Sequence, residues 1–455
     1  MHFKDEILDG LAQKGNVAQF ISYGPNCGTD QRFLWINDVV PNTKFLSAQE
    51  AIGLLIKRSS ENRVNVRSFN PEQPKGHPFV YGLTKTEDVL ATIKKNASEG
   101  LYSIVNETID VNDGGVSGVA LGNVIEFTPN DTPKGVDKPG TCNLPREIGL
   151  AILESVYNFR PQIDFPKNIR VEFSIHPMRR GIRMDNTIIW ELEEFSNLPT
   201  SNDVDIRWPN NFSKIIGDKA FGLLVADNLG LPVPRTTVIS RTVAPFTFGS
   251  DTGVSEVWIR TAPVIRTPGK FSTYKGWRDP FKILSEEDPE HNKIASVLCQ
   301  QSVNSVYSGS LLTDKNDLPL IEGVAGRGDL FMVGGASIEQ VPIAIINKIT
   351  EVFNWAFEKL GPIEMEWVFD GEKVWTVQLH KSTHVVSYGA VIVPGTPKSY
   401  IDFDVTNGLE KLRELITTVQ GTDVGIKVHG NVGVTSHYGD VLRKANIPSF
   451  VERKL

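Results

Sequence analysis

Three polar residues recur at nearly the same spacing in the two halves of this 455-residue chain. An arginine, a strand amide and a glutamate stand at Arg67, Asn106 and Glu172, and again at Arg260, Gln300 and Glu366. The step from arginine to amide is 39 residues in the first half and 40 in the second, and the step from amide to glutamate is 66 in both. A duplicated module keeps its loop lengths while its surface residues drift. We therefore expect an α/β (α+β) chain with two related modules, over residues 1–200 and 205–384, and a smaller domain over 385–455.

Composition bounds the class of protein. With 40% hydrophobic and 22% charged residues the chain is typical of globular proteins, and its length predicts more than one core. A net charge of −7 argues against nucleic acid or an anionic membrane surface as the main partner. The three cysteines show no CxxC spacing, the N-terminus has no apolar signal region, and no apolar run reaches membrane-spanning length. These features predict a cytoplasmic location, and they leave open whether the chain forms a homo-oligomer or joins a partner subunit.

The stretch Pro362 to His380 reads as a β-hairpin, because two alternating runs flank the turn signal Asp370-Gly371. Alternation predicts an apolar face made of Met365, Trp367 and Phe369 on the first strand and Trp375, Val377 and Leu379 on the second. The other face would carry the polar residues, which are Glu364, Glu366, Thr376, Gln378 and His380.

A loop over residues 371–373 would place Glu366 directly opposite Gln378. A carboxylate and an amide oxygen at one point suit a hard cation such as Mg²⁺, although an ordinary exposed hairpin face has the same composition. The earlier hairpin, residues 170–194, is a weaker copy that offers Glu172 and Glu191 at the matching positions.

The second module opens with a segment that suits a phosphate group. A strand is expected to lead into Gly217-Asp218-Lys219, where Asp218 would cap a helix from Lys219 to Leu229 and Gly230 would end it. A lysine at a helix N-terminus favours a bound polyanion, although most such lysines are simply solvated. A second glycine-rich loop, residues 320–335, contains Glu322 and Arg327 and could approach phosphate or ribose.

In the C-terminal part, a strand is expected to end at Thr435-Ser436-His437 and a helix to begin at once. A histidine at such a junction is exposed, has hydroxyl neighbours that could fix its tautomer, and lies near backbone amides that hold anions. These features suit an imidazole that accepts a phosphoryl group, and a helix-capping histidine is the plain alternative.

These motifs together resemble the ATP-grasp dikinase superfamily, which includes pyruvate phosphate dikinase, phosphoenolpyruvate synthase, rifampicin phosphotransferase and glutamine kinase. The segments that carry the resemblance are IIGDKAFGLLVADNLGLPVP, NVRSFNP and WIRTAP, VLCQQSVNSVYSG, EMEWVFDGEKVWTVQLH and GVTSHYGDVLRKANIP. The resemblance implies two tandem ATP-grasp-like modules, the first degenerate, and a phosphohistidine-like swivelling domain.

The resemblance also implies roles for single residues. Lys219 and Arg260 would bind ATP phosphates, Gln300 would lie on the adenine side, and Glu366 with Gln378 would ligate Mg²⁺. His437 would be the mobile acceptor. Apart from the resemblance, the glycine-rich loop leads us to expect Glu322 and Arg327 at the nucleotide site as well. The implied function is transfer of a phosphoryl group from ATP through His437 to a small-molecule acceptor.

Several positions depart from the family pattern. Where the family has an arginine after the hairpin glutamine, this chain has His380. The first module lacks the Gly-Asp-Lys segment and has Asn106 where the family has a glutamine. Two other functions therefore stay open. One is an ATP-grasp ligase or direct kinase without phosphohistidine, and the other is a nucleotide-binding sensor or assembly subunit without catalysis.

Overall fold

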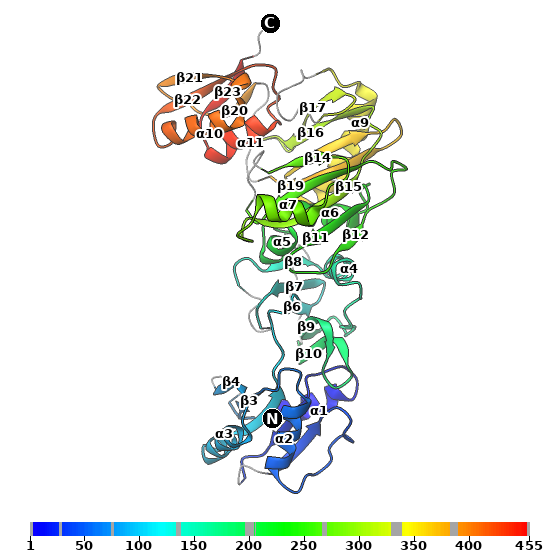
Figure 1. Ribbon diagram of the computed structural model, residues 1–455, viewed down its shortest axis with the longest axis vertical. Coiled ribbons are helices and arrows are strands. Elements are labelled where there is room, and N and C mark those ends of the chain that lie inside the picture. The colour runs from blue at the N-terminus through cyan, green and yellow to red at the C-terminus, as the bar shows by residue number, and fades with distance from the viewer. Residues whose placement is uncertain are drawn as a thin grey trace. The chain divides into compact units, whose positions relative to one another are not determined.

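The computed structural model describes residues 3–26, 30–73, 77–132, 138–195, 204, 206–265, 271–328, 339–382 and 390–452 (Figure 1). The chain divides into two compact units. The first comprises Met1–Leu150 and Phe159–Val204, and the second comprises Ala151–Asn158 and Asp205–Leu455.

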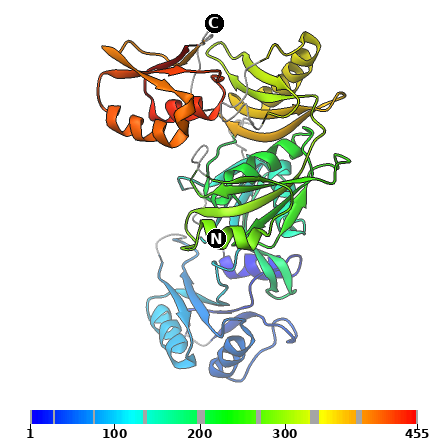
Figure 2. The ribbon, with the colours of Figure 1, turned by 45° about the horizontal axis from the view of Figure 1, so that its top comes forward.

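The N-terminal sheet of the first unit has the strand order β2-β1-β5-β3-β4, with antiparallel pairing throughout. Its elements are α1 (Lys4–Ala12), β1 (Phe20–Tyr23), β2 (Gln31–Trp35), α2 (Ala48–Arg58), β3 (Val64–Phe69), β4 (Phe79–Leu83), α3 (Thr86–Ser98) and β5 (Tyr102–Glu107). Leu55 of α2 and Ile93 of α3 are buried in one cluster with Val66 and Val105 of the strands. Figure 2 shows both helices, in blue, on the same side of these strands.

The second sheet of the first unit has the order β10-β9-β6-β7-β8 and is also antiparallel. Its strands are β6 (Val116–Leu121), β7 (Val124–Pro129), β8 (Cys142–Pro145), β9 (Ile169–Arg180) and β10 (Asp185–Glu194), and helix α4 (Arg146–Tyr157) follows β8. Phe127, Leu144 and Phe173 are fully buried and form part of its core.

The second unit begins with a sheet of order β12-β11-β15-β13-β14. Its elements are α5 (Asn211–Ile216), α6 (Asp218–Asn228), β11 (Thr236–Ser240), β12 (Phe246–Phe248), β13 (Val257–Pro263), β14 (Thr273–Lys275), α7 (Pro280–Glu287) and β15 (Ile294–Gln301). Next comes a four-stranded sheet of order β17-β16-β18-β19. Its elements are β16 (Tyr307–Thr313), β17 (Pro319–Ala325), α9 (Ile343–Leu360), β18 (Ile363–Phe369) and β19 (Val374–Lys381).

Helix α9 covers this four-stranded sheet and contacts β17, β18 and β19. Its buried residues Ile345, Ile349, Phe353 and Leu360 recur at helical spacing, so one apolar stripe faces the strands. On the strand side, Met365 and Trp367 are buried. The opposite face of the sheet, which carries Glu366, is therefore the face that remains for polar groups.

The two units repeat one pattern of strands. The order β2-β1-β5-β3-β4 in the first unit matches β12-β11-β15-β13-β14 in the second, and β10-β9-β6-β7 matches β19-β18-β16-β17. Arg67 lies opposite Ile104, two residues before Asn106, and Arg260 lies opposite Leu298, two residues before Gln300. The spacing in the sequence thus corresponds to the same pairing in both sheets.

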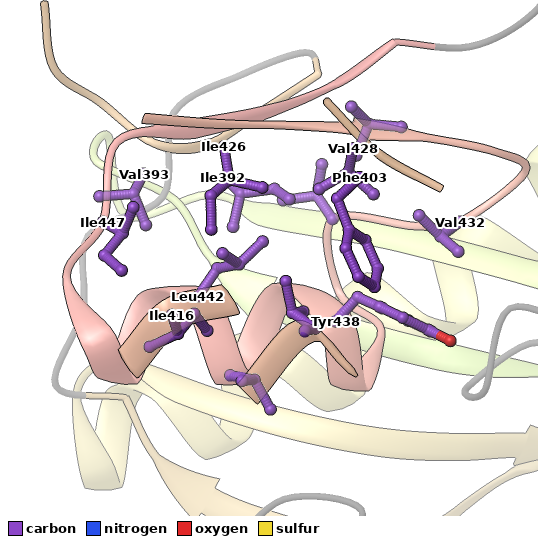
Figure 3. Packing of buried hydrophobic residues seen from close by; sticks show 14 of the residues in the cluster. Ile392, Val393, Phe403, Ile416, Ile426, Val428, Val432, Tyr438, Leu442 and Ile447 are labelled. Carbon is purple, nitrogen blue, oxygen red and sulfur yellow. The ribbon is translucent and has the colours of Figure 1, made fainter. Parts of the chain in front are cut away.

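The C-terminal part of the second unit contains a sheet of order β20-β23-β22-β21. Its elements are β20 (Val391–Val393), β21 (Ser399–Asp404), the 3-10 turn η2 (Val405–Asn407), α10 (Gly408–Val419), β22 (Val424–His429), α11 (His437–Ala445) and β23 (Ser449–Glu452). Figure 3 shows Ile416, Tyr438 and Leu442 of the helices facing Ile426 and Phe403 of the strands. Leu312 of β16 belongs to the same buried cluster, so this part packs on the four-stranded sheet.

Two local predictions in the second unit are wrong. Residues 214–216 end helix α5 instead of forming a strand, because Asn210 caps that helix in a reciprocal arrangement with Ser213. Asp218 does not cap α6, since Gly217 holds the N-cap position and the Asp218 carboxylate accepts a hydrogen bond from Ser213. The helix after Lys219 and the left-handed Gly230 beyond its end agree with the prediction.

No helix within the described ranges is both long and apolar enough to cross a membrane.

Candidate functional site

The hairpin of β18 and β19 places Glu366 opposite Gln378, as predicted, but by a different route. The loop has four residues, since Phe369 pairs with Val374, and the register shifts by one residue between the Trp367–Thr376 and Glu366–Gln378 pairs. Val377 is therefore the extra residue of a β-bulge. The longer loop and the bulge compensate each other, so the predicted pair is restored.

The bulge changes the faces of the two residues that precede it. Thr376 pairs with Trp367 and Trp375 pairs with Val368, so Thr376 lies on the apolar face and Trp375 on the Glu366 face. The prediction placed these two residues the other way round. Thr376 is fully buried, and its hydroxyl lies 3.5 Å from the sulfur of Met365.

The carbonyl of the bulge residue Val377 gathers two of the predicted site residues. Arg260 Nη1 donates to it at 3.4 Å, and Gln300 Nε2 donates to it at 3.5 Å. Arg260 Nη1 also lies 3.5 Å from Glu366 Oε2, with both side chains less than one fifth exposed. Arg260, Gln300, Glu366 and Gln378 are thus brought together at one place.

Two polar groups at this place have no hydrogen-bond partner among the residues that the structure describes. Arg260 Nε is buried and has no hydrogen-bond partner within the described ranges. The half-buried Gln378 amide likewise receives no hydrogen bond from any described residue. Buried polar groups are normally paired, so the Nε of Arg260 points to a polar ligand, and the half-buried Gln378 amide lies beside it.

The described residues hold no group of three or more His, Cys, Asp or Glu side chains that could bind a metal ion. Glu366 and Gln378 alone supply two oxygens. This number fits Mg²⁺, which keeps several waters and takes further oxygens from phosphates. The donor set therefore fits a nucleotide-bound Mg²⁺ better than a resident structural metal.

A row of polar residues crosses the four-stranded sheet. Ser310 of β16 pairs with Glu322 of β17 on one side and with Glu366 of β18 on the other, and Glu366 pairs with Gln378. Directly paired residues point to the same face of a sheet. Glu322, Ser310, Glu366 and Gln378 therefore form one line, which we call the polar row.

The segment before His437 lies on the polar row. Glu322 Oε2 accepts hydrogen bonds from the backbone N–H of Thr435 at 2.8 Å and from its hydroxyl at 2.7 Å. Ser310 Oγ donates to Thr435 Oγ1 at 2.6 Å. All three residues are at least nine-tenths buried. Thr435 is thus fixed one strand away from Glu366.

His437 is the first residue of α11, and its side chain is 23% exposed. Its Nδ1 is buried, has no hydrogen-bond partner in the part of the chain that the structure describes, and lies 3.7 Å from Asp440 Oδ2. Asp440 is itself held by buried Arg443, which also donates to the carbonyl of Val434. The carboxylate of Asp440 is therefore the group that faces the imidazole.

Two sequence predictions about this segment are wrong. The segment before Thr435 is a loop, because β22 ends at His429. The hydroxyls of Thr435 and Ser436 do not reach His437, since Thr435 bonds to Glu322 and Ser436 donates to the carbonyl of Gly433.

The other predicted residues lie as follows. Lys219 is half-buried in the first turn of α6, which contacts β13 and β19. Arg327 is exposed and its guanidinium lies 5.9 Å from the centre of the Trp258 ring. His380 is buried and pairs with Glu364. Residues 329–338 of the glycine-rich loop lie outside the described residues.

At the equivalent place in the first unit, the two glutamates form ion pairs with basic side chains. Glu191 lies opposite Glu172, as expected. The register shifts between Ile189 and Glu191, so Trp190 is the extra residue of a bulge, as Val377 is in the second unit. Arg67 binds Glu191 at 3.0 Å, Lys4 lies 3.7 Å from the same carboxylate, and Arg170 binds Glu172 at 2.5 Å. Both carboxylates are thus neutralised by side chains of the unit itself.

The same face of the first unit carries a buried hydrogen-bonded chain. Asp113 binds His176 Nδ1, His176 Nε2 contacts Ser174 Oγ, each at 2.8 Å, and Ser174 accepts from Trp190. Ser174 is only 2% exposed and His176 only 3%, so most of this chain lies inside the unit.

Sequence reasoning did not assign roles to Ser310, Asp440 and Arg443. Ser308-Gly309 recurs as Ser117-Gly118 in the first half, but the residue equivalent to Ser310 is Val119 there, so this repeat does not mark Ser310. Asp440 follows His437 by three residues and Arg443 follows Asp440 by three, and this i,i+3 spacing on a helix was the available signal.

No protein family model matches this sequence, and no curated protein matches it. Among solved structures, D-alanine–D-alanine ligase from Helicobacter pylori aligns over 38% of this chain and 53% of its own, with 10% identity and a TM-score of 0.25. The corresponding ligase from Bacillus anthracis, complexed with ATP, covers 38% and 57% at 10% identity and a TM-score of 0.26.

The macrocyclase MdnC from Microcystis aeruginosa, bound with precursor peptide MdnA, covers 37% and 53% at 9% identity and a TM-score of 0.22. The alignments thus span about half the length of these structures. Scores of this size do not establish a shared fold.

Proposed function

We propose that the second unit binds ATP with Mg²⁺ and passes a phosphoryl group through His437 to a small-molecule acceptor. The observation that carries the proposal is the docking of Thr435 on the polar row, one strand from Glu366. It brings the histidine segment to the sheet face that holds the predicted metal pair. The equivalent place in the first unit is filled by ion pairs, which supports a single nucleotide site.

In this proposal Arg260 and Lys219 supply positive charge for the phosphates, and the Val377 carbonyl, which also accepts a hydrogen bond from Gln300, holds Arg260 in place. Glu366 and Gln378 would ligate Mg²⁺, which neutralises phosphate charge when it is bound. Phosphoryl transfer depends mainly on alignment and on charge neutralisation, and these groups provide both.

Because His437 Nδ1 is buried against Asp440, we assign the attack to Nε2. Asp440 would favour a proton on Nδ1, which leaves the lone pair of Nε2 free. That lone pair forms a P–N bond as the P–O bond to the leaving nucleotide breaks. Attack at the β-phosphorus releases AMP, and water then removes the terminal phosphate from the pyrophosphorylated histidine. The remaining phosphoryl group passes to the acceptor.

Product analysis tests the dikinase form of this reaction. We expect AMP and phosphate to form from ATP and Mg²⁺ when an acceptor is present. ADP as the nucleotide product would instead support a ligase or a direct kinase. Thermal stabilisation by nucleotide without any turnover would support a non-catalytic sensor. The motivating features for that alternative are His380, which stands where the family has an arginine, and the departures of the first module.

A further inference from the structure

We infer that Glu322 and Ser310 form a docking clamp for the histidine segment, and that Glu322 acts on Thr435 rather than on the nucleotide. This inference rests on the proposed function, since the clamp matters for catalysis only if His437 accepts a phosphoryl group. It replaces the nucleotide-binding role that the sequence analysis expects for Glu322.

The clamp is a buried and directional set of contacts. One carboxylate oxygen of Glu322 accepts both the backbone N–H and the hydroxyl of Thr435, and Ser310 donates to that hydroxyl. The hydroxyl of Thr435 therefore donates to Glu322 while it accepts from Ser310. Valine in place of Thr435 could make neither contact, whereas serine could make both.

The clamp is compatible with a bound nucleotide. It occupies the Glu322 end of the polar row. Among the described residues the side chain of Thr435 hydrogen-bonds to Glu322 and Ser310, whereas Glu366 and Gln378 lie at the other end of the row. The docked histidine segment and the metal pair can therefore be present together. Ser310 lies between them and belongs to both neighbouring strand pairs.

Docking also reaches His437 through the helix that follows. Ser436 holds the N-cap position of α11, and Asp440 N donates to the carbonyl of Ser436. Arg443 ties α11 back to the Val434 carbonyl, next to Thr435. Fixing Thr435 thus fixes the start of the helix that presents His437. Glu322 is a positioning residue in this account, because it acts on His437 through Thr435.

Amide hydrogen exchange in the full chain tests the clamp without relying on activity. We expect slow exchange of the Thr435 N–H in the wild type and at least about tenfold faster exchange in Glu322→Ala. Glu126→Ala is the matched control, because Glu126 has the same position in β7 of the first unit. Unchanged protection of Thr435 in Glu322→Ala would overturn the inference.

Two further measurements separate this inference from the proposed function. Stabilisation by Mg²⁺ and ATP should be the same in Glu322→Ala as in the wild type. Loss of that stabilisation would show that Glu322 contributes to nucleotide binding and would overturn the inference. Labelling of His437 should fall by about 10-fold or more in Glu322→Ala, Ser310→Ala and Thr435→Val but not in Thr435→Ser. Full labelling of all three variants would overturn the clamp. Absence of label in the wild type would refute the phosphohistidine route and leave the exchange result standing.

Discussion

Arg260 Nη1 donates to the backbone carbonyl of Val377, the extra residue of the bulge in β19, at 3.4 Å. The same nitrogen lies 3.5 Å from Glu366. A bulge re-aims the backbone, and here it turns a carbonyl toward an arginine on another sheet. The arginine is therefore positioned from two sides before any ligand binds.

Arg260→Ala should abolish most of the stabilisation by ATP and Mg²⁺ and lower turnover by about 100-fold or more, because a charged phosphate contact is lost. Differential scanning fluorimetry and a turnover assay measure the two effects. Arg67→Ala is the control, since Arg67 has the same place in the first unit and forms a partly exposed ion pair there. That variant should keep full turnover and lose about 1 kcal/mol of stability at most. Equal losses in both variants would contradict a single nucleotide site.

Glu366→Gln should raise the Mg²⁺ concentration needed for half-maximal stabilisation by ATP at least about tenfold. Substituting residues that only hydrogen-bond to metal ligands already lowers metal affinity by about 10-fold or more, and Glu366 is proposed as a ligand itself. A Mg²⁺ titration at fixed ATP gives this value. Glu172→Gln in the first unit should leave it unchanged, since Arg170 already occupies that carboxylate. An unaltered Mg²⁺ requirement in Glu366→Gln would remove this residue from the metal site.

Gly222→Ala should destabilise the second unit. A Cβ at this position would lie 2.0 Å from the carbonyl oxygen of Leu379, so α6 would have to move away from β19. Overpacking of this kind costs about 1–3 kcal/mol. Gly10→Ala is the matched helical control, because a Cβ there meets nothing within 4 Å. It should stabilise α1 by about 0.5–1 kcal/mol. Thermal or denaturant unfolding of both variants checks the pair, and a neutral Gly222→Ala would show that this contact is not tight.

Acid should weaken the central hairpin through Asp370. Burial by itself raises the pKa of this carboxyl, but hydrogen bonds from Lys373, Trp375 and Glu372 outweigh it and lower the pKa below its ordinary value. A depressed pKa in the folded state means that the stabilisation is present above the unfolded pKa of about 3.9 and is lost as the pH falls through the folded value.

Asp370→Asn should therefore reduce stability at neutral pH and flatten its decline in acid, with exposed Glu286→Gln as the control. Unfolding curves between neutral pH and about pH 2 measure both slopes. A variant whose stability declines in acid as steeply as that of the wild type would contradict this role of Asp370.

Elements with a strong period were predictable from sequence. Helix α2 is one example, because AQEAIGLLIKR has one apolar face and Ser47 caps it. The hairpins were predictable from alternation around turn residues. Residues 214–216 were misassigned because an apolar run of this length fits either a strand end or a helix end, and the decisive signal was the cap formed by Asn210 and Ser213.

The bulge at Val377 could not be predicted, because a three-residue loop without a bulge gives the same Glu366–Gln378 pair as a four-residue loop with one. The contact between Glu322 and Thr435 joins residues 113 positions apart, and no local pattern marks it. Sequence therefore named most members of the site, whereas the way they are held depends on packing between sheets.

The most direct test of the account is to locate the phosphoryl group on the protein. ATP labelled at the β-phosphate is incubated with the full chain and Mg²⁺, and peptide mapping follows under alkaline conditions that preserve phosphohistidine. We predict label on His437 that disappears in His437→Asn and persists in His429→Asn, a histidine of the same C-terminal part. Turnover of ATP with no label on His437, or with normal rates in His437→Asn, would contradict the account.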